Sequence, residues 1–146
     1  MQAREKTMQS WDGTELFYRM WMPRKKSRKA VILFHRGHEH SGRWQDVIDK
    51  LNLPDCHFFA WDARGHGRSP GERGYAESFG HLVKDMDAFV RHISDTYGIA
   101  YEDMVVMAHS VGSVMAATWV HDYAPPIRAL VLGSPALRVR LYVPFA

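Results

Sequence analysis

Cysteine and long hydrophobic runs are scarce in this chain. Its 146 residues include one cysteine, Cys56, so no disulfide can form within the chain. No apolar stretch approaches the roughly 18 residues that a membrane-spanning helix needs, and no apolar run follows residues 1–6 that would serve as a secretory signal. We therefore expect a soluble, cytoplasmic protein with no membrane span, and we leave transient contact with a membrane surface open.

A large excess of charge of one sign is also missing, because 19 Lys and Arg residues against 16 Asp and Glu residues give a net charge of +3. Much of the positive charge lies in residues 23–29, Pro-Arg-Lys-Lys-Ser-Arg-Lys. No aromatic residues are interleaved with this segment, so we predict a solvated surface loop and no nucleic-acid partner. A binder of anionic surfaces acting through Arg24 to Lys29 is the weaker alternative.

Short apolar runs alternate with helical patterns along the chain. Asp12-Gly13 separates two strand-like runs, residues 5–10 and 15–22, which predicts an antiparallel hairpin. Four further runs have the length of buried strands: residues 30–34, 57–61, 104–107 and 127–132. Helices are predicted over residues 44–51, 78–97 and 111–123. This order predicts one α/β domain over residues 1–146, with a doubly wound, mostly parallel sheet and an N-terminal antiparallel hairpin.

The predicted helix at residues 78–97 is amphipathic. Ser78 can cap its start and Gly98 can end it. The charged residues opposite its apolar stripe are expected on a solvated surface: Lys84, Asp85, Asp87, Arg91 and Asp95.

Residues 104–113, Met-Val-Val-Met-Ala-His-Ser-Val-Gly-Ser, have the pattern of a nucleophile elbow. In that turn a strand passes directly into a helix, and the serine at the apex exposes its hydroxyl. Small residues are needed two positions before and after the serine, and Ala108 and Gly112 stand there. Ser110 is therefore the predicted nucleophile. A plain core serine is the alternative, against which its place between a strand and a helix argues.

Two other segments follow predicted strands and share the same end of the sheet with Ser110: residues 35–43 and residues 62–69. Together the three segments resemble the α/β-hydrolase fold, and within it the serine hydrolases similar to monoacylglycerol lipase and lysophospholipase. The resemblance extends from Asp12 to Pro135. It implies an α/β-hydrolase-type sheet that is truncated before the lid and the last strands.

The family's first motif is usually His-Gly-x-Gly-Glu-His-x-Gly-Arg, with the oxyanion hole formed by the amide at x and the amide after the nucleophile. Carried over to this chain, the resemblance implies that the backbone N–H groups of Gly37 and Val111 form the oxyanion hole. This chain has Arg36 and His38 where the family has glycines, so the geometry of the hole depends on whether either position needs glycine's backbone freedom. The residues expected to shape the site are His35, Arg36, His38, Glu39, His109 and Gly112. The resemblance assigns His109 to packing rather than to proton transfer.

The histidines around Glu39 invite a metal hypothesis, but neither zinc-binding helix motif is present, because Gly42 and Arg36 occupy the positions that would need histidine. We therefore predict a hydrogen-bonded loop and no metal. A dinucleotide-binding loop at Gly65-x-Gly67 is discounted because Pro70 replaces the third glycine. No cofactor is expected.

A serine nucleophile needs a histidine base and an acid, which in this fold follow it in the order acid, then histidine. After Ser110 the chain offers only His121 and Asp122. Both lie on the same predicted helix as the nucleophile, roughly 16 Å along its axis, and cannot serve it. Family members continue with a lid and two more strands, and residues 141–146 fall where the lid would begin. We therefore expect a nucleophile-bearing N-terminal part, inactive alone, with a C-terminal continuation that carries the lid and, in some bacterial relatives, a further domain.

The leading hypothesis is a serine hydrolase that cleaves a small-molecule acyl ester of lipid type through an acyl-enzyme on Ser110. Monoacylglycerols or lysophospholipids are the substrates that the resemblance implies. A proline-iminopeptidase-like peptidase is one alternative, because the same fold and elbow host it. A non-catalytic hydrolase fold used for binding or as a scaffold is the other.

Overall fold

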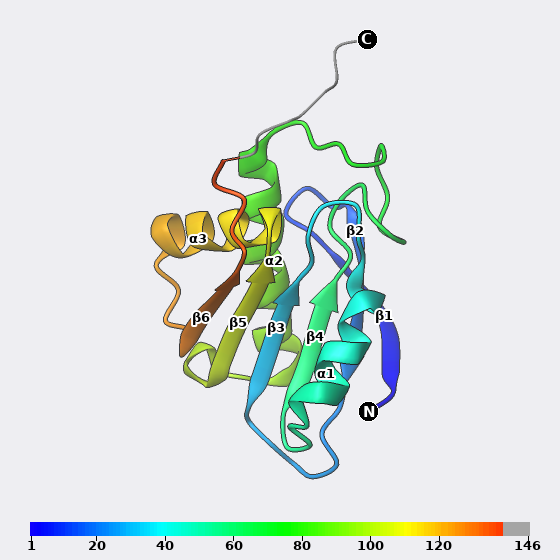
Figure 1. Ribbon diagram of the computed structural model, residues 1–146, viewed down its shortest axis with the longest axis vertical. Helices are drawn as coiled ribbons and strands as arrows, with labels where there is room; N and C mark the ends of the chain where they lie inside the picture. Colours follow the sequence, from blue (N-terminus) through cyan, green and yellow to red (C-terminus); the bar gives the residue numbers. More distant parts are fainter. Residues whose placement is uncertain (139–146) are drawn as a thin grey trace.

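The computed structural model describes residues 1–138 as one six-stranded sheet with helices on both faces (Figure 1). The strands are β1 (Ala3–Gln9), β2 (Glu15–Trp21), β3 (Ala30–Phe34), β4 (His57–Trp61), β5 (Met104–His109) and β6 (Ala129–Gly133). They lie in the order β1-β2-β4-β3-β5-β6. The β1-β2 and β2-β4 pairs are antiparallel, and the β4-β3, β3-β5 and β5-β6 pairs are parallel. The predicted hairpin and mostly parallel sheet are confirmed.

Three α-helices connect the strands: α1 (Gln45–Leu51), α2 (Phe79–Tyr97) and α3 (Val111–Tyr123). The short 3-10 turns η1 (Ser41–Trp44) and η2 (Tyr101–Asp103) precede α1 and β5. Helix α2 begins as predicted, with the Ser78 hydroxyl accepting a hydrogen bond from the His81 N–H, and it ends at Gly98, whose φ is 64°. Within residues 1–138, no helix is long and apolar enough to cross a membrane.

The sheet separates two hydrophobic cores. Helix α1 covers one face, and α2 and α3 cover the other (Figure 1). Side chains of β3 alternate between the two, because successive residues of a strand point to opposite faces. Ile32 and Phe34 pack with residues of α2 and α3, whereas Val31 and Leu33 pack with Trp44 and residues of α1. With both faces covered, all five residues of β3 are buried, as a continuous apolar run predicts.

Strand β6 differs from the expected buried strand. Three of its five residues are exposed, including Val131 and Leu132. Within the described residues β5 is its only sheet neighbour, so β6 forms an edge. The predicted start of a lid, residues 141–146, lies outside the described residues.

The charged face of α2 is also different from the prediction, because Asp85 is completely buried. Its carboxylate accepts hydrogen bonds from the Ser10 hydroxyl and from Nε and Nη2 of Arg64. The same guanidinium donates to Asp12 at 2.7 and 3.0 Å. Arg64 therefore links α2 to the β1-β2 turn. The helical spacing places Asp85 on the polar face of α2, but it could not show that the loop after β4 covers Asp85.

We expect Asp85→Asn to lower the free energy of unfolding by about 3 kcal/mol, because it leaves the Arg64 guanidinium with one carboxylate and sets an amide N–H against a donor. Urea unfolding followed by circular dichroism measures this change. Asp95→Asn, on the exposed part of the same helix, is the control and should shift stability by less than about 0.5 kcal/mol. Equal losses in the two variants would contradict a structural role for the buried carboxylate.

Candidate active site

Ser110 lies at the turn between β5 and α3. Its backbone has φ 56° and ψ −119°, a conformation that residues other than glycine rarely adopt. Such strain costs on the order of 1 to 3 kcal/mol and persists only where the surroundings fix it. Here the Ser110 N–H donates to the Gly133 carbonyl at 2.9 Å, and the Ser113 hydroxyl donates to the carbonyls of Ala108 and Gly133 at 2.9 and 3.0 Å. These bonds fasten the turn to the ends of β5 and β6.

Gly112 brings the start of α3 directly against the end of β3. A Cβ atom at this position would lie 2.6 Å from the carbonyl oxygen of His35 and 3.1 Å from that of Phe34. No larger residue fits unless the backbone moves, which explains the small residue two positions after the serine. Since β3 lies between β4 and β5 in the sheet, Ser110 and the loop after β3 meet where the strand order reverses, the usual ligand position in such sheets.

The two predicted oxyanion-hole residues are neighbours. A Cβ atom on Gly37 would lie 3.7 Å from Cγ1 of Val111, and both residues line a cavity of about 170 Å³. The structure therefore brings the segments that carry the two amides together. Their role as donors to an oxyanion stays a prediction.

Only one of the two departures from the family glycines uses glycine's backbone freedom. His38 has φ 58°, in the left-handed region, whereas Arg36 is not among the residues with positive φ. The loop after β3 therefore has, at residue 38, the positive φ that favours glycine, and His38 adopts it with backbone strain. The His38 ring lies beside Gly74, where a Cβ atom would be 3.5 Å from Cε1, and 6.4 Å from the ring of His66.

His35 is buried at the end of β3, and both of its ring nitrogens are occupied. Nε2 accepts from the Ala63 N–H at 3.0 Å, so Nδ1 carries the proton and donates to the Arg36 carbonyl at 2.6 Å. Burial lowers the pKa of His35 to about 4, partly offset by the hydrogen bond to that carbonyl. A neutral ring with both nitrogens engaged holds the loop in place and is not available as a base for Ser110.

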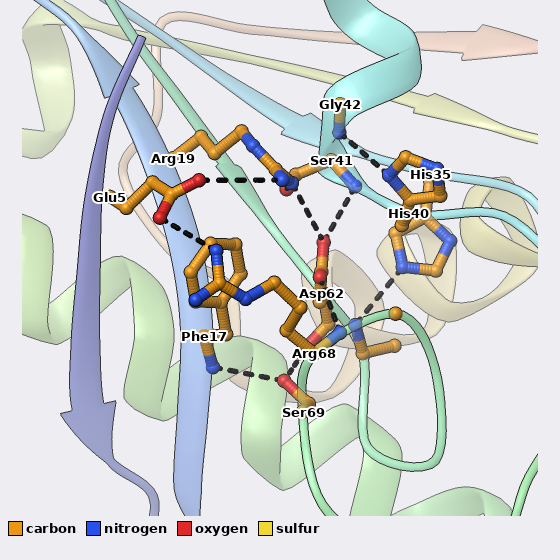
Figure 2. Close-up of polar contacts among 12 residues, drawn as sticks. Glu5, Phe17, Arg19, His35, His40, Ser41, Gly42, Asp62, Arg68 and Ser69 are labelled. Atoms are coloured by element: carbon orange, nitrogen blue, oxygen red, sulfur yellow. Dashed lines mark hydrogen bonds and ion pairs between the residues drawn. The ribbon is translucent and has the colours of Figure 1, made fainter.

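Asp62 connects the loops that surround the site (Figure 2). This fully buried carboxylate accepts from the backbone N–H groups of Ser41 at 2.6 Å and Arg68 at 2.8 Å. Nη1 of Arg19 lies 3.8 Å from it and donates to the Ser41 hydroxyl at 2.6 Å. Gly67 is required beside it, because a Cβ atom there would collide with the Asp62 carboxylate. The segment at residues 62–69 is thus a structural loop, as the resemblance implies.

Sequence reasoning did not single out Asp62 or Arg19, although both support the loop after β3. The available signal for Asp62 was its place directly after a strand and before Gly65-x-Gly67, where a buried carboxylate can bind backbone amides. Arg19 gave no comparable signal, since its partners Ser41 and Asp62 are distant in the sequence.

Two cavities are lined by the residues on either side of Ser110. His109, directly before it, lines a cavity of about 440 Å³ on the α1 side of the sheet, and Val111, directly after it, lines the cavity of about 170 Å³ near α2. His35 and Arg36 line both. His109 is half-buried, and its Cδ2 lies 3.4 Å from the position of a Cβ atom on Gly133, which is consistent with a packing role.

The remaining charged groups of the site do not complete a catalytic triad. His121 and Asp122 are exposed at the far end of α3, where their side chains contact each other at 2.8 Å. Glu39 accepts from Nε of Arg36 at 2.7 Å. Within residues 1–138, no group of three or more His, Cys, Asp or Glu side chains is arranged to hold a metal ion.

The sheet order, the strained serine turn and the glycine behind it define an α/β-hydrolase. The pattern of the family described as "Serine aminopeptidase, S33" matches residues 25–146. The chain therefore belongs to this family of α/β-hydrolases, in the group that includes the monoacylglycerol lipases.

Curated relatives include YnbC of Escherichia coli K12, a protein described as uncharacterized, which is 55% identical over 136 residues, 92% of this chain and 23% of that protein. The monoacylglycerol lipase of Mycolicibacterium smegmatis is 31% identical over 130 residues, 86% of this chain and 44% of the lipase. Among solved structures, the monoacylglycerol lipase of Paleococcus ferrophilus has a TM-score of 0.67 and 26% identity, covering 99% of this chain and 47% of that one. The chain spans less than half the length of each of these relatives.

We expect His38→Gly to be more stable than His38→Ala by about 1 kcal/mol, because both remove the imidazole but only glycine takes φ 58° without strain. Chemical denaturation of both variants tests this. The same pair at Glu72, a residue without positive φ, is the control and should give the opposite order. If alanine is as stable as glycine at residue 38, the loop does not carry strain there.

The buried neutral His35 predicts a pH dependence of stability. Its pKa falls from 6.5 in the unfolded chain to about 4 in the folded one, so the unfolded state binds more protons between these values and stability is lost as the pH falls. The contribution is fully present above pH 6.5 and amounts to about 3 kcal/mol. The stability difference between the native protein and His35→Gln should shrink by this order between pH 7 and pH 4. A difference that stays constant would contradict it.

Proposed function

We propose that this chain is the nucleophile-bearing N-terminal part of a serine hydrolase that cleaves lipid-type carboxylic esters. The observation that carries the proposal is the backbone of Ser110, held at φ 56° and ψ −119° between β5 and α3. Strain of this kind at a polar, half-buried residue is typical of a functional site. The close contact of Gly112 with the end of β3 supports it by fixing the turn.

In the proposed reaction the Ser110 hydroxyl oxygen attacks the ester carbonyl carbon, and its proton passes to a histidine. The amides of Gly37 and Val111 donate to the carbonyl oxygen as it becomes negative, and each donor of this kind is worth about 3 kcal/mol of barrier. The alcohol leaves with the proton from the histidine, and an acyl-enzyme forms on Ser110. Water then releases the acid by the reverse sequence of proton transfers.

The histidine base and its acid are proposed to come from a segment beyond the described residues. His35 is excluded by its two hydrogen bonds, and His121 lies at the wrong end of α3. The greater length of the relatives supports this assignment, because each contains more chain than the part that matches. The 146 residues alone are therefore expected to hydrolyse esters poorly or not at all.

The apolar character of the site supports a lipid-type substrate. Trp44, Val47, Met107 and Val131 line the larger cavity, and Trp61, Leu82 and Met115 line the smaller one. Pockets of this kind suit an acyl chain. Monoacylglycerols and lysophospholipids are the proposed substrates.

A peptidase is the second candidate, because the matching family is described as a serine aminopeptidase. The same nucleophile and oxyanion hole would then act on an aminoacyl amide. Comparing the turnover of medium-chain monoacylglycerols with that of aminoacyl p-nitroanilides separates the two. A non-catalytic role as a binding module or scaffold would give turnover of neither.

We expect a fluorophosphonate probe to label the full-length protein, including any chain after residue 146, on Ser110. Ser110→Ala should abolish labelling, because no other described serine occupies a strained turn between a strand and a helix. Ser27→Ala, in the basic loop between β2 and β3, is the matched control and should label as the native protein does. Absence of labelling in the native full-length protein would overturn the nucleophile assignment.

A further inference from the structure

Three charged side chains, which we call the rim, line the 440 Å³ cavity that begins next to Ser110: Arg36, Glu39 and Arg43. Arg36 occupies a position that is glycine in the resembling family. Its Nη2 lies 2.7 Å from Oε1 of Glu39, and Nε of Arg43 lies 3.4 Å from Oε2 of the same carboxylate. The two arginine side chains remain 53% and 67% exposed, so both guanidinium groups face solvent at the mouth of the site.

The rim carries one uncompensated positive charge. Desolvation opposes the ionisation of Glu39, but the hydrogen bond and charge of Arg36 and the charge of Arg43 outweigh it, and the pKa of Glu39 lies below its ordinary value. One carboxylate is thus shared between two arginines. At Arg64 the ratio of carboxylates to guanidinium groups is reversed, because Asp12 and Asp85 share one guanidinium.

Apart from these charged groups and the imidazoles of His35 and His109, the cavity is lined by apolar residues. Trp44 lines it and is 9% exposed. Arg36 and Arg43 both supply donors, while the one carboxylate of the rim already accepts from them.

We propose that this cavity binds an anionic amphiphile, with a phosphate or carboxylate group held by Arg36 and Arg43 and a hydrocarbon segment against Trp44, Val47 and Met107. A surplus of donors around an apolar floor complements acceptor oxygens attached to a chain. The identification of this ligand as a substrate rests on the proposed function, because His35, Ala108 and His109 bound the cavity next to Ser110. The inference then selects acyl esters with a negative charge, such as lysophospholipid-type phosphates, over neutral monoacylglycerols.

The test is isothermal titration of the full-length protein with three non-hydrolysable probes below their micellar concentrations: dodecyl phosphate, dodecanoate and 1-O-dodecylglycerol. The two anions should bind about tenfold to a hundredfold more tightly than the neutral ether, the range expected for hydrogen bonds to a charged group. Arg36→Gln and Arg43→Gln should each reduce this preference by about tenfold. Arg28→Gln removes the same charge from the basic loop before β3, at the opposite end of the parallel strands, and should leave the preference as it is.

Inorganic phosphate is the fourth ligand of the titration, because it distinguishes a headgroup site from an amphiphile site. Binding of inorganic phosphate as tight as that of dodecyl phosphate would overturn the role of the apolar floor. Equal affinity for the anions and the ether, or an Arg36→Gln effect no larger than that of Arg28→Gln, would overturn the anionic selectivity. Selective binding together with absent fluorophosphonate labelling would uphold the ligand class and reject the proposed hydrolysis, so the two failures are distinguishable.

Discussion

The close approach of Gly112 to the end of β3 is the contact on which the geometry of the site depends. The carbonyls of Phe34 and His35 leave no space for a Cβ atom at this position, so the first turn of α3 lies directly against the central strand. This contact forces the chain to turn sharply at Ser110, and the bonds from Ser110 and Ser113 to Gly133 and Ala108 hold that turn. The serine is therefore placed by backbone packing rather than by its own side chain.

Polar contacts, rather than close backbone packing, hold the loop that faces Ser110. Asp62 and His35 are both buried, and each accepts or donates to backbone groups of a neighbouring loop, so the loops after β3 and β4 form one unit. Arg19 extends this unit to β2 and, at 3.8 Å, to Glu5 of β1 (Figure 2). Buried polar groups of this kind are stable only when each is satisfied, and that requirement makes the loop conformation specific.

Local sequence patterns were sufficient for the elements of the fold, because the short runs at residues 30–34 and 57–61, apolar apart from His57, are typical of strands covered on both faces. Ser110 could be predicted as the nucleophile from a local pattern too, since the elbow needs small residues at fixed spacings. The burial of Asp85 and the exposure of β6 could not be predicted from the sequence, because burial depends on what covers an element. The loop after β4 buries Asp85 within the polar face of α2, and among the described residues β6 is paired on one side only. Contacts such as Asp62 with Ser41 join residues 21 positions apart and leave no periodic signal.

Two residues other than glycine adopt positive φ where the loop after β3 meets the elbow, and the reasons differ. At Ser110 the strain accompanies a hydroxyl that glycine cannot provide, so the cost is inseparable from the proposed chemistry. At His38 φ is also positive, but nothing in the elbow requires an imidazole. Its ring instead lies beside Gly74 and near His66, in the segment that lines the smaller cavity with Gly37 and Val111. Arg36 lines the same cavity, so both positions where the family has glycine carry a side chain there that contributes to the cavity's shape.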